Sequence, residues 1–119
     1  MNFIFDYDRP IYVQLIWWFK LYIISGKIKS GERLASVRDL AMELKVNPNT
    51  LQRALSELEE MGLIYTERTN GKFVTDDNEL INKYRKEYVN EKINQYFKDM
   101  EDIGIDRDTA IKYLKEVDK

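Results

Sequence analysis

The chain has 119 residues, 44% hydrophobic and 34% charged, so it is long enough for one domain or two small ones and apolar enough to fold. It contains no cysteine and no histidine, which excludes disulfides and thiolate metal sites and removes the commonest general base and metal ligand. The net charge is −2, but residues 76–119 carry nine basic and twelve acidic side chains, whereas residues 27–75 carry eight and seven.

This composition gives no support to catalysis or to membrane insertion. The five glycines are scattered, so there is no phosphate-binding loop, and no motif places the carboxylates for acid–base chemistry. We therefore expect a protein that is not an enzyme and has no cofactor or metal. The apolar run at residues 11–24 is too short to span a bilayer and is interrupted by Gln14 and Lys20. With no signal-peptide pattern and no cysteine, the sequence favours the cytoplasm.

The first predicted helix begins near Pro10, a residue suited to a first turn, and ends at Gly26. One apolar stripe is formed by Ile11, Leu15, Trp18, Phe19 and Tyr22. Further apolar residues fall outside this stripe: Tyr12, Ile16, Trp17, Ile23 and Ile24. We therefore expect the helix to pack against two elements, and most of its aromatic rings to belong to the core rather than to a ligand site.

Two short helices and a tight turn are predicted next. Residues 27–36 are interpreted as a loop, and Ser36 with Asp39 has the spacing of a capping box at the start of a second helix. That helix has one apolar face, made of Val37, Leu40, Ala41 and Leu44. Asn47 is expected to cap a third helix with Pro48 in its first turn, and its apolar stripe is Leu51, Ala54, Leu55 and Leu58. This order is typical of a helix-turn-helix.

A β-hairpin and two more helices complete the prediction. Residues 63–68 and 72–76 supply the β-formers Ile64, Tyr65, Phe73 and Val74, which flank Asn70-Gly71, a strong hairpin signal. A long helical pattern then runs from about Glu79 to Ile103, with a heptad-like apolar seam of Val89, Ile93, Tyr96, Met100 and Ile103. After Gly104, Asp106 is expected to cap a last helix whose apolar face is Ile111, Leu114 and Val117.

Polar side chains crowd the N-terminal end of the third predicted helix: Asn47, Asn49, Thr50, Gln52 and Arg53. The acids Glu57, Glu59 and Glu60 all lie in its second half. A cap and a solvated surface would account for some of these residues. They would not account for the separation of amides and a guanidinium from the acids, which favours contact with a negatively charged partner.

The run SGKIKSGERLASVRDLAMELKVNPNTLQRALSELEEMGLIYTERTNGKFV resembles the winged-helix domain of GntR-type bacterial transcription regulators, and the resemblance covers roughly residues 8–76. The NPNT and QRA elements, with the short two-helix tail, resemble the YtrA branch of that family. The resemblance implies a dimeric DNA-binding regulator, in many members a repressor, and the branch is associated with transporter genes. The chain departs from the family pattern at Ala35, where proline is common, and in its short wing.

The resemblance also implies which residues contact DNA. Arg38, Asn49, Thr50 and Gln52 match contact positions, and Gly71 matches the wing tip that approaches the minor groove. The residue chemistry agrees, since Asn and Gln can pair with adenine and a helix N-terminus suits a phosphate. Arg53, Arg68 and Lys72 are added as contacts. Local alternatives are a surface ion pair for Arg38, an ion pair with Glu57 for Arg53, hydrogen bonding at the helix start for Asn49 and Thr50, and a purely capping role for Asn47.

We expect a mainly α fold with a small β-hairpin: a winged helix-turn-helix over residues 1–76 and a helical dimerisation tail over residues 77–119. The function expected is a sequence-specific homodimeric regulator, a repressor on an inverted-repeat operator in double-stranded DNA. A winged-helix protein-interaction adaptor is the alternative, and it would need apolar patches where the polar residues stand. The sequence leaves open whether the tail binds a small-molecule effector.

Overall fold

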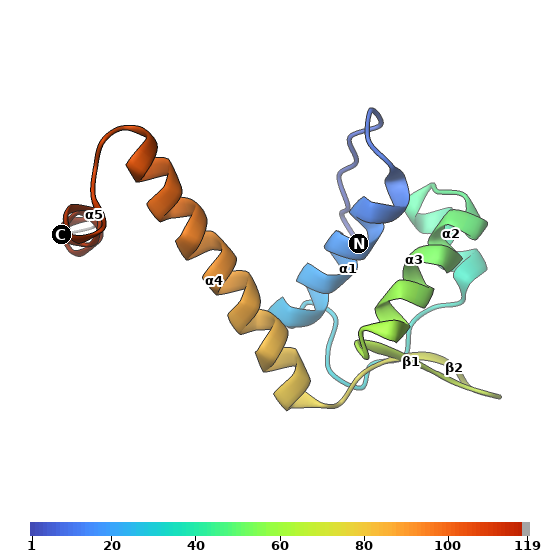
Figure 1. The fold of residues 1–119 in the computed structure, drawn as a ribbon. Helices are drawn as coiled ribbons and strands as arrows, with labels where there is room; N and C mark the ends of the chain where they lie inside the picture. The colour runs from blue at the N-terminus through green and yellow to red at the C-terminus, as the bar shows by residue number, and fades with distance from the viewer. Residues whose placement is uncertain (118–119) are drawn as a thin grey trace. The chain divides into compact units, whose positions relative to one another are not determined.

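The structure, a computed structural model, describes residues 1–117, and within them it has five α-helices and one two-stranded antiparallel sheet (Figure 1). The elements follow the order α1 (Ile11–Ser25), α2 (Val37–Leu44), α3 (Pro48–Glu60), β1 (Ile64–Glu67), β2 (Gly71–Val74), α4 (Asn78–Asp102) and α5 (Arg107–Glu116). The chain divides into two compact units, Met1–Lys83 and Tyr84–Lys119, and the division falls inside α4. The predicted mainly helical class with one hairpin is confirmed.

Helix α1 is the centre of the first unit. It begins after Pro10 and ends at Gly26, whose φ of +82° places it in the left-handed conformation that glycine adopts without strain. One face packs against α3 and buries Leu15 and Phe19 completely. Ile23 and Ile24, which the predicted stripe left out, are also buried. The chain turns back at the helix end, where the Ile28 N–H donates to the Tyr22 carbonyl at 3.1 Å and the Ile28 side chain is buried.

The N-terminal segment covers the second apolar face of α1. The ring of Phe3 stacks on Trp18, with centroids 5.5 Å apart, and meets Phe19 edge-on. The buried amide of Gln14 accepts a hydrogen bond from the backbone N–H of Asp6 and donates one to its carbonyl, both at 2.8 Å. Thus the two apolar faces of α1 do pack against two elements, and the polar residue in the apolar run is satisfied by backbone.

The helix-turn-helix is set by its caps, as predicted. The Ser36 side chain accepts a hydrogen bond from the Asp39 N–H and starts α2, and Asn47 accepts one from the Asn49 N–H and starts α3. Between them Lys45 takes a left-handed φ of +58°, which turns the chain within three residues. Leu40, Leu44 and Leu51 are buried where α2 packs against α3.

The hairpin pairs Ile64 with Val74 through to Glu67 with Gly71, and Arg68, Thr69 and Asn70 form the turn. The segment predicted as a plain loop contributes a third extended stretch. The Leu34 N–H donates to the Lys72 carbonyl at 2.8 Å and the Val74 N–H to the Glu32 carbonyl at 2.9 Å. Only Leu34 of this stretch is apolar and buried, so its sequence carries no strand periodicity.

The second unit contains most of α4 and all of α5. Asp106 caps α5 by accepting a hydrogen bond from the Thr109 N–H at 2.9 Å, as predicted, and the bond lowers the pKa of its carboxyl. The Tyr96 hydroxyl donates to the Ala110 carbonyl at 2.7 Å, and the Arg107 guanidinium lies over the Phe97 ring. Val117, expected in the apolar face of the last helix, instead follows its end and is exposed.

Leu55→Ala should lower the free energy of unfolding by about 2–5 kcal/mol, because it leaves a cavity in place of a completely buried side chain. Urea unfolding followed by circular dichroism measures the change. Glu57→Ala, an exposed position two residues along the same helix, is the control and should stay within about 0.5 kcal/mol of wild type. Equal losses in both variants would contradict the assignment of the core.

Candidate nucleic-acid interface

Helix α3 has one wholly apolar face and one polar face. Leu51, Ala54, Leu55 and Leu58 are completely buried, so Asn49, Gln52 and Arg53 are turned outward. Thr50, between the two faces, is half-buried. Among residues 1–117 the Gln52 side chain makes one hydrogen bond, a long one of 3.4 Å from its amide to the Ser56 hydroxyl. The amide functions at this end of the helix are therefore accessible to a partner.

The side chain of Arg53 is held by an aromatic ring of α1. Its guanidinium lies over the ring of Tyr12 from α1, with its central carbon 3.6 Å from the ring centroid. Within residues 1–117 the guanidinium forms no ion pair, so the alternative of a pair with Glu57 gains no support. A guanidinium stacked on a ring by its face keeps its N–H groups at the edge, where they can bind phosphate or a base. The stacking is compatible with the predicted contact and limits the orientations of the side chain.

Arg38 lies in the first turn of α2 and is exposed. Among residues 1–117 its side chain makes no hydrogen bond or ion pair, so the alternative of a surface ion pair within the helix gains no support. The buried Leu40 and Leu44 hold α2 against α3 on the other side. A charged side chain without a partner costs nothing in water, and it is available to a phosphate.

The tip of the hairpin carries a second group of candidates. Arg68 and Gly71 are both exposed, and Gly71 has a φ of +95°, which other residues adopt only with strain. The side chain of Arg33 lies along the tip: a Cβ atom added at Gly71 would be 3.6 Å from its Nε. The turn of the hairpin thus carries one guanidinium, that of Arg68, and the side chain of Arg33 reaches Gly71 from the extended stretch before α2. Glycine at this position allows close approach of a nucleic-acid backbone.

Lys72, the other predicted wing contact, is engaged within the protein. Its ammonium group forms an ion pair with Glu59 at the end of α3 and donates a hydrogen bond to the Thr66 hydroxyl at 3.0 Å. Its side chain is only 17% exposed. Lys72 therefore differs from the exposed candidates Arg68 and Gly71, because its charged group already has partners within the protein.

These elements form a winged helix-turn-helix. A helix with a polar N-terminal half can enter the major groove of B-DNA, the preceding helix can cross the backbone, and a hairpin beside them can reach a neighbouring groove. The acids Glu57 and Glu60 lie on the exposed distal half of α3, away from the end that would enter the groove. This distribution suits a polyanion better than it suits an apolar protein surface.

The sequence signature of bacterial regulatory proteins of the gntR family matches residues 20–74. The transcriptional regulator YhcF of Bacillus subtilis is 30% identical over 93% of this chain and 92% of its own, and the transcriptional repressor YtrA of the same organism is 31% identical over 92% and 85%. A GntR family transcriptional regulator from Listeria monocytogenes has a similar structure, with a TM-score of 0.85 and 37% identity over 96% of this chain and 100% of its own. The chain belongs to the GntR family. The predicted family and YtrA-like relatives are confirmed.

Membership fixes the general function. The protein is a DNA-binding transcriptional regulator with a GntR-type helix-turn-helix, and since its relatives are regulators, the expectation that it is not an enzyme is confirmed. Over residues 1–117 no helix is long and apolar enough to cross a bilayer. The contacts of individual residues with DNA stay predictions.

Sequence reasoning missed Arg33. It was assigned to a loop, and the pairing that brings it to the wing joins residues about 40 positions apart, through the bridge between Arg33 and Phe73. A cation that follows Gly31 closely and directly precedes the apolar Leu34 is the signal that the sequence offers. The stacking of Tyr12 beneath Arg53 was missed for the same reason, because it joins α1 to α3.

Arg38→Ala should weaken DNA binding by on the order of 1–3 kcal/mol while leaving the fold intact, because it removes one charged contact from an exposed surface. Fluorescence anisotropy on a bound duplex measures the loss, and thermal unfolding checks the fold. Lys98→Ala removes the same charge from α4, where the lysine pairs with Asp102, and should bind as wild type. Equal effects of both variants would mean that Arg38 acts only through net charge.

Proposed function

We propose that the protein is a homodimeric repressor that binds an inverted-repeat operator. In this proposal Asn49, Thr50 and Gln52 read base edges, while Arg38, Arg53, Arg68 and the Gly71 backbone contact phosphates and the minor groove. The observation that carries it is the polarity of α3, whose N-terminal half exposes amides and a guanidinium while its other face is completely buried. Its relative YtrA is a transcriptional repressor, which supports the sign of regulation.

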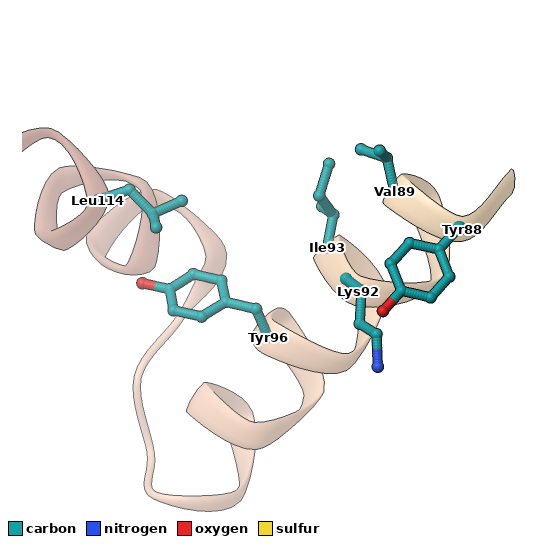
Figure 2. Close-up of a pocket in the computed structure, with 6 residues that line it drawn as sticks. All are labelled: Tyr88, Val89, Lys92, Ile93, Tyr96 and Leu114. Atoms are coloured by element: carbon teal, nitrogen blue, oxygen red, sulfur yellow. The ribbon is translucent and has the colours of Figure 1, made fainter. Parts of the chain in front are cut away.

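The dimer in this proposal is formed by the tail, residues 77–119. In the second unit Val89 and Ile93 are 46% and 43% exposed, although both belong to the predicted heptad seam. Beside them lies a hollow of about 340 Å³ lined by Tyr88, Val89, Lys92, Ile93, Tyr96 and Leu114 (Figure 2). Leu114 belongs to α5, and the other residues of the hollow belong to α4.

A second copy of the chain is the occupant that fits this hollow. A seam with apolar residues at heptad spacing buries them against an identical helix, and two-fold symmetry makes the same patch serve both subunits. The hydrophobic gain is about 25 cal/mol for each Å² of apolar surface buried, so a few such side chains contribute several kcal/mol. An effector in the hollow is the alternative occupant. The division at residue 76, a cytoplasmic location and transporter genes as targets also belong to the proposal.

Selection of bound sequences from a random pool of duplex DNA should return an inverted repeat, because two recognition helices related by a two-fold axis meet two half-sites. Binding to the recovered duplex should fall steeply as salt rises from about 50 to 200 mM. A pool that yields single half-sites would contradict the dimer. If no DNA sequence is enriched from the pool and the protein instead binds another protein through an apolar patch, the adaptor is favoured.

Ile93→Glu should convert the protein to a monomer. Binding to the inverted repeat should weaken by about 10²–10⁴-fold, because the two half-site contacts are then no longer linked in one molecule. Light scattering gives the mass, and anisotropy gives the affinity. Asn94→Glu adds the same charge at the next position, outside the seam, and should stay dimeric. A wild-type protein that is monomeric at micromolar concentration would refute the tail interface, and a dimer that dissociates only with an added small molecule would assign the hollow to an effector.

A further inference from the structure

The ion pair of Lys72 is part of a closed polar cluster between the recognition helix and the wing. The Thr66 hydroxyl donates to the Glu59 carboxylate at 2.6 Å, and the Lys72 ammonium donates both to that carboxylate and to the hydroxyl. All three bonds converge, with Glu59 Oε1 accepting two of them. Glu59 comes from the last turn of α3, Thr66 from β1 and Lys72 from β2, so one cluster joins three elements.

The cluster continues the apolar contact between the hairpin and α3. Thr66 and Lys72 are directly opposite in the ladder, two residues from the buried pair of Ile64 and Val74. Alternate residues of a strand share a face, so all four side chains lie on the side that packs against the helix. The next pair outward is Glu67 with Gly71, at the wing tip. The polar cluster therefore lies between the buried pair and the tip.

The chemistry of the cluster fits a structural link. The Glu59 and Lys72 side chains are 33% and 17% exposed, whereas Glu57 and Glu60 of the same helix are exposed. Partial burial alone would raise the pKa of Glu59, but the bonds from Lys72 and Thr66 and the lysine charge lower it below its ordinary value. The carboxylate is thus charged at neutral pH, and it balances the lysine charge. A phosphate that took the lysine would have to break this pair.

We propose that Glu59 and Lys72 position the wing for DNA, and that Lys72 is not itself a phosphate contact. The link holds the hairpin against α3, and through the backbone bond from Leu34 to Lys72 it also holds the segment that carries Arg33. The tip, with Gly71 beside the Arg33 side chain, is then fixed relative to the reading end of α3. This inference rests on the proposed binding of DNA through α3 and the wing.

The test compares Glu59→Gln with Glu60→Gln, on the duplex recovered by selection. Both variants remove one negative charge from the end of α3, and Glu60 is exposed and outside the cluster. Removing an acid from a DNA-binding surface should by itself favour binding, so Glu60→Gln should bind at least as tightly as wild type. Glu59→Gln should instead weaken binding by about three- to tenfold, the range that one net hydrogen bond contributes.

Lys72→Met separates positioning from direct contact. If Lys72 bound phosphate, its removal would reduce the steepness of log affinity against log salt concentration by about 0.9. As a positioning residue, Lys72→Met should weaken binding with an unchanged slope. The double variant Glu59→Gln/Lys72→Met should be no weaker than the weaker single variant, since both remove one link. Thermal unfolding confirms that each variant is folded.

Hydrogen exchange of the hairpin amides, measured without DNA, provides a readout that is independent of the proposed function. It should quicken in residues 66–72 of Glu59→Gln and Lys72→Met and stay unchanged in Glu60→Gln. If no variant and not even wild type binds DNA, the proposed function fails while exchange still reports the link. The positioning role is overturned if exchange is unchanged, if Glu59→Gln binds like Glu60→Gln, or if Lys72→Met alone lowers the salt slope.

Discussion

The packing of α1 against α3 is the contact on which the rest of the first unit depends. Leu15 and Phe19 on one side and Leu51 and Leu55 on the other have no exposed surface, so the rotation of α3 about its own axis is fixed. A close-packed interior does not tolerate small rotations, because each would open voids. Fixing that rotation decides which residues of α3 face outward. The exposed Asn49, Gln52 and Arg53 owe their common direction to leucines that contact nothing outside the protein.

The charged side chains of the first unit fall into two groups. Some are neutralised within the protein, as with Glu59 and Lys72, and some are left accessible, as with Arg38 and Arg68. The net charge of −2 therefore says little about the surface that meets DNA. An acid that is paired and partly buried repels a phosphate less than a free one would, since its field is balanced at close range. A protein with an acidic total can thus belong to a family of DNA-binding regulators.

Local signals were sufficient for most of the fold. The caps at Ser36, Asn47 and Asp106 and the turn at Gly71 depend on residues within a few positions of each other, and sequence spacing reveals such features directly. The pairing of residues 32–34 with β2, the stacking of Arg53 on Tyr12 and the engagement of Lys72 all depend on long-range contacts. Nothing in their immediate sequence distinguishes Lys72 from Arg68, although one is held and the other is exposed. For this reason the sequence suffices to propose a site, but it does not show which cations are engaged within the protein.

The two units differ in how far they satisfy their own apolar residues. The first unit buries a continuous core from Leu15 to Ile81, whereas within the described part of the second unit Ala110 is the one completely buried residue. Small helical units with so little buried surface gain little stability from their own packing. A partner that binds only the folded tail would stabilise it by mass action, so folding of the tail and its association would be linked. In the proposed dimer the concentration of the protein would then control both tail structure and the joining of two reading helices. The winged helix, with its core complete in one chain, needs no such partner to hold its reading surface in place.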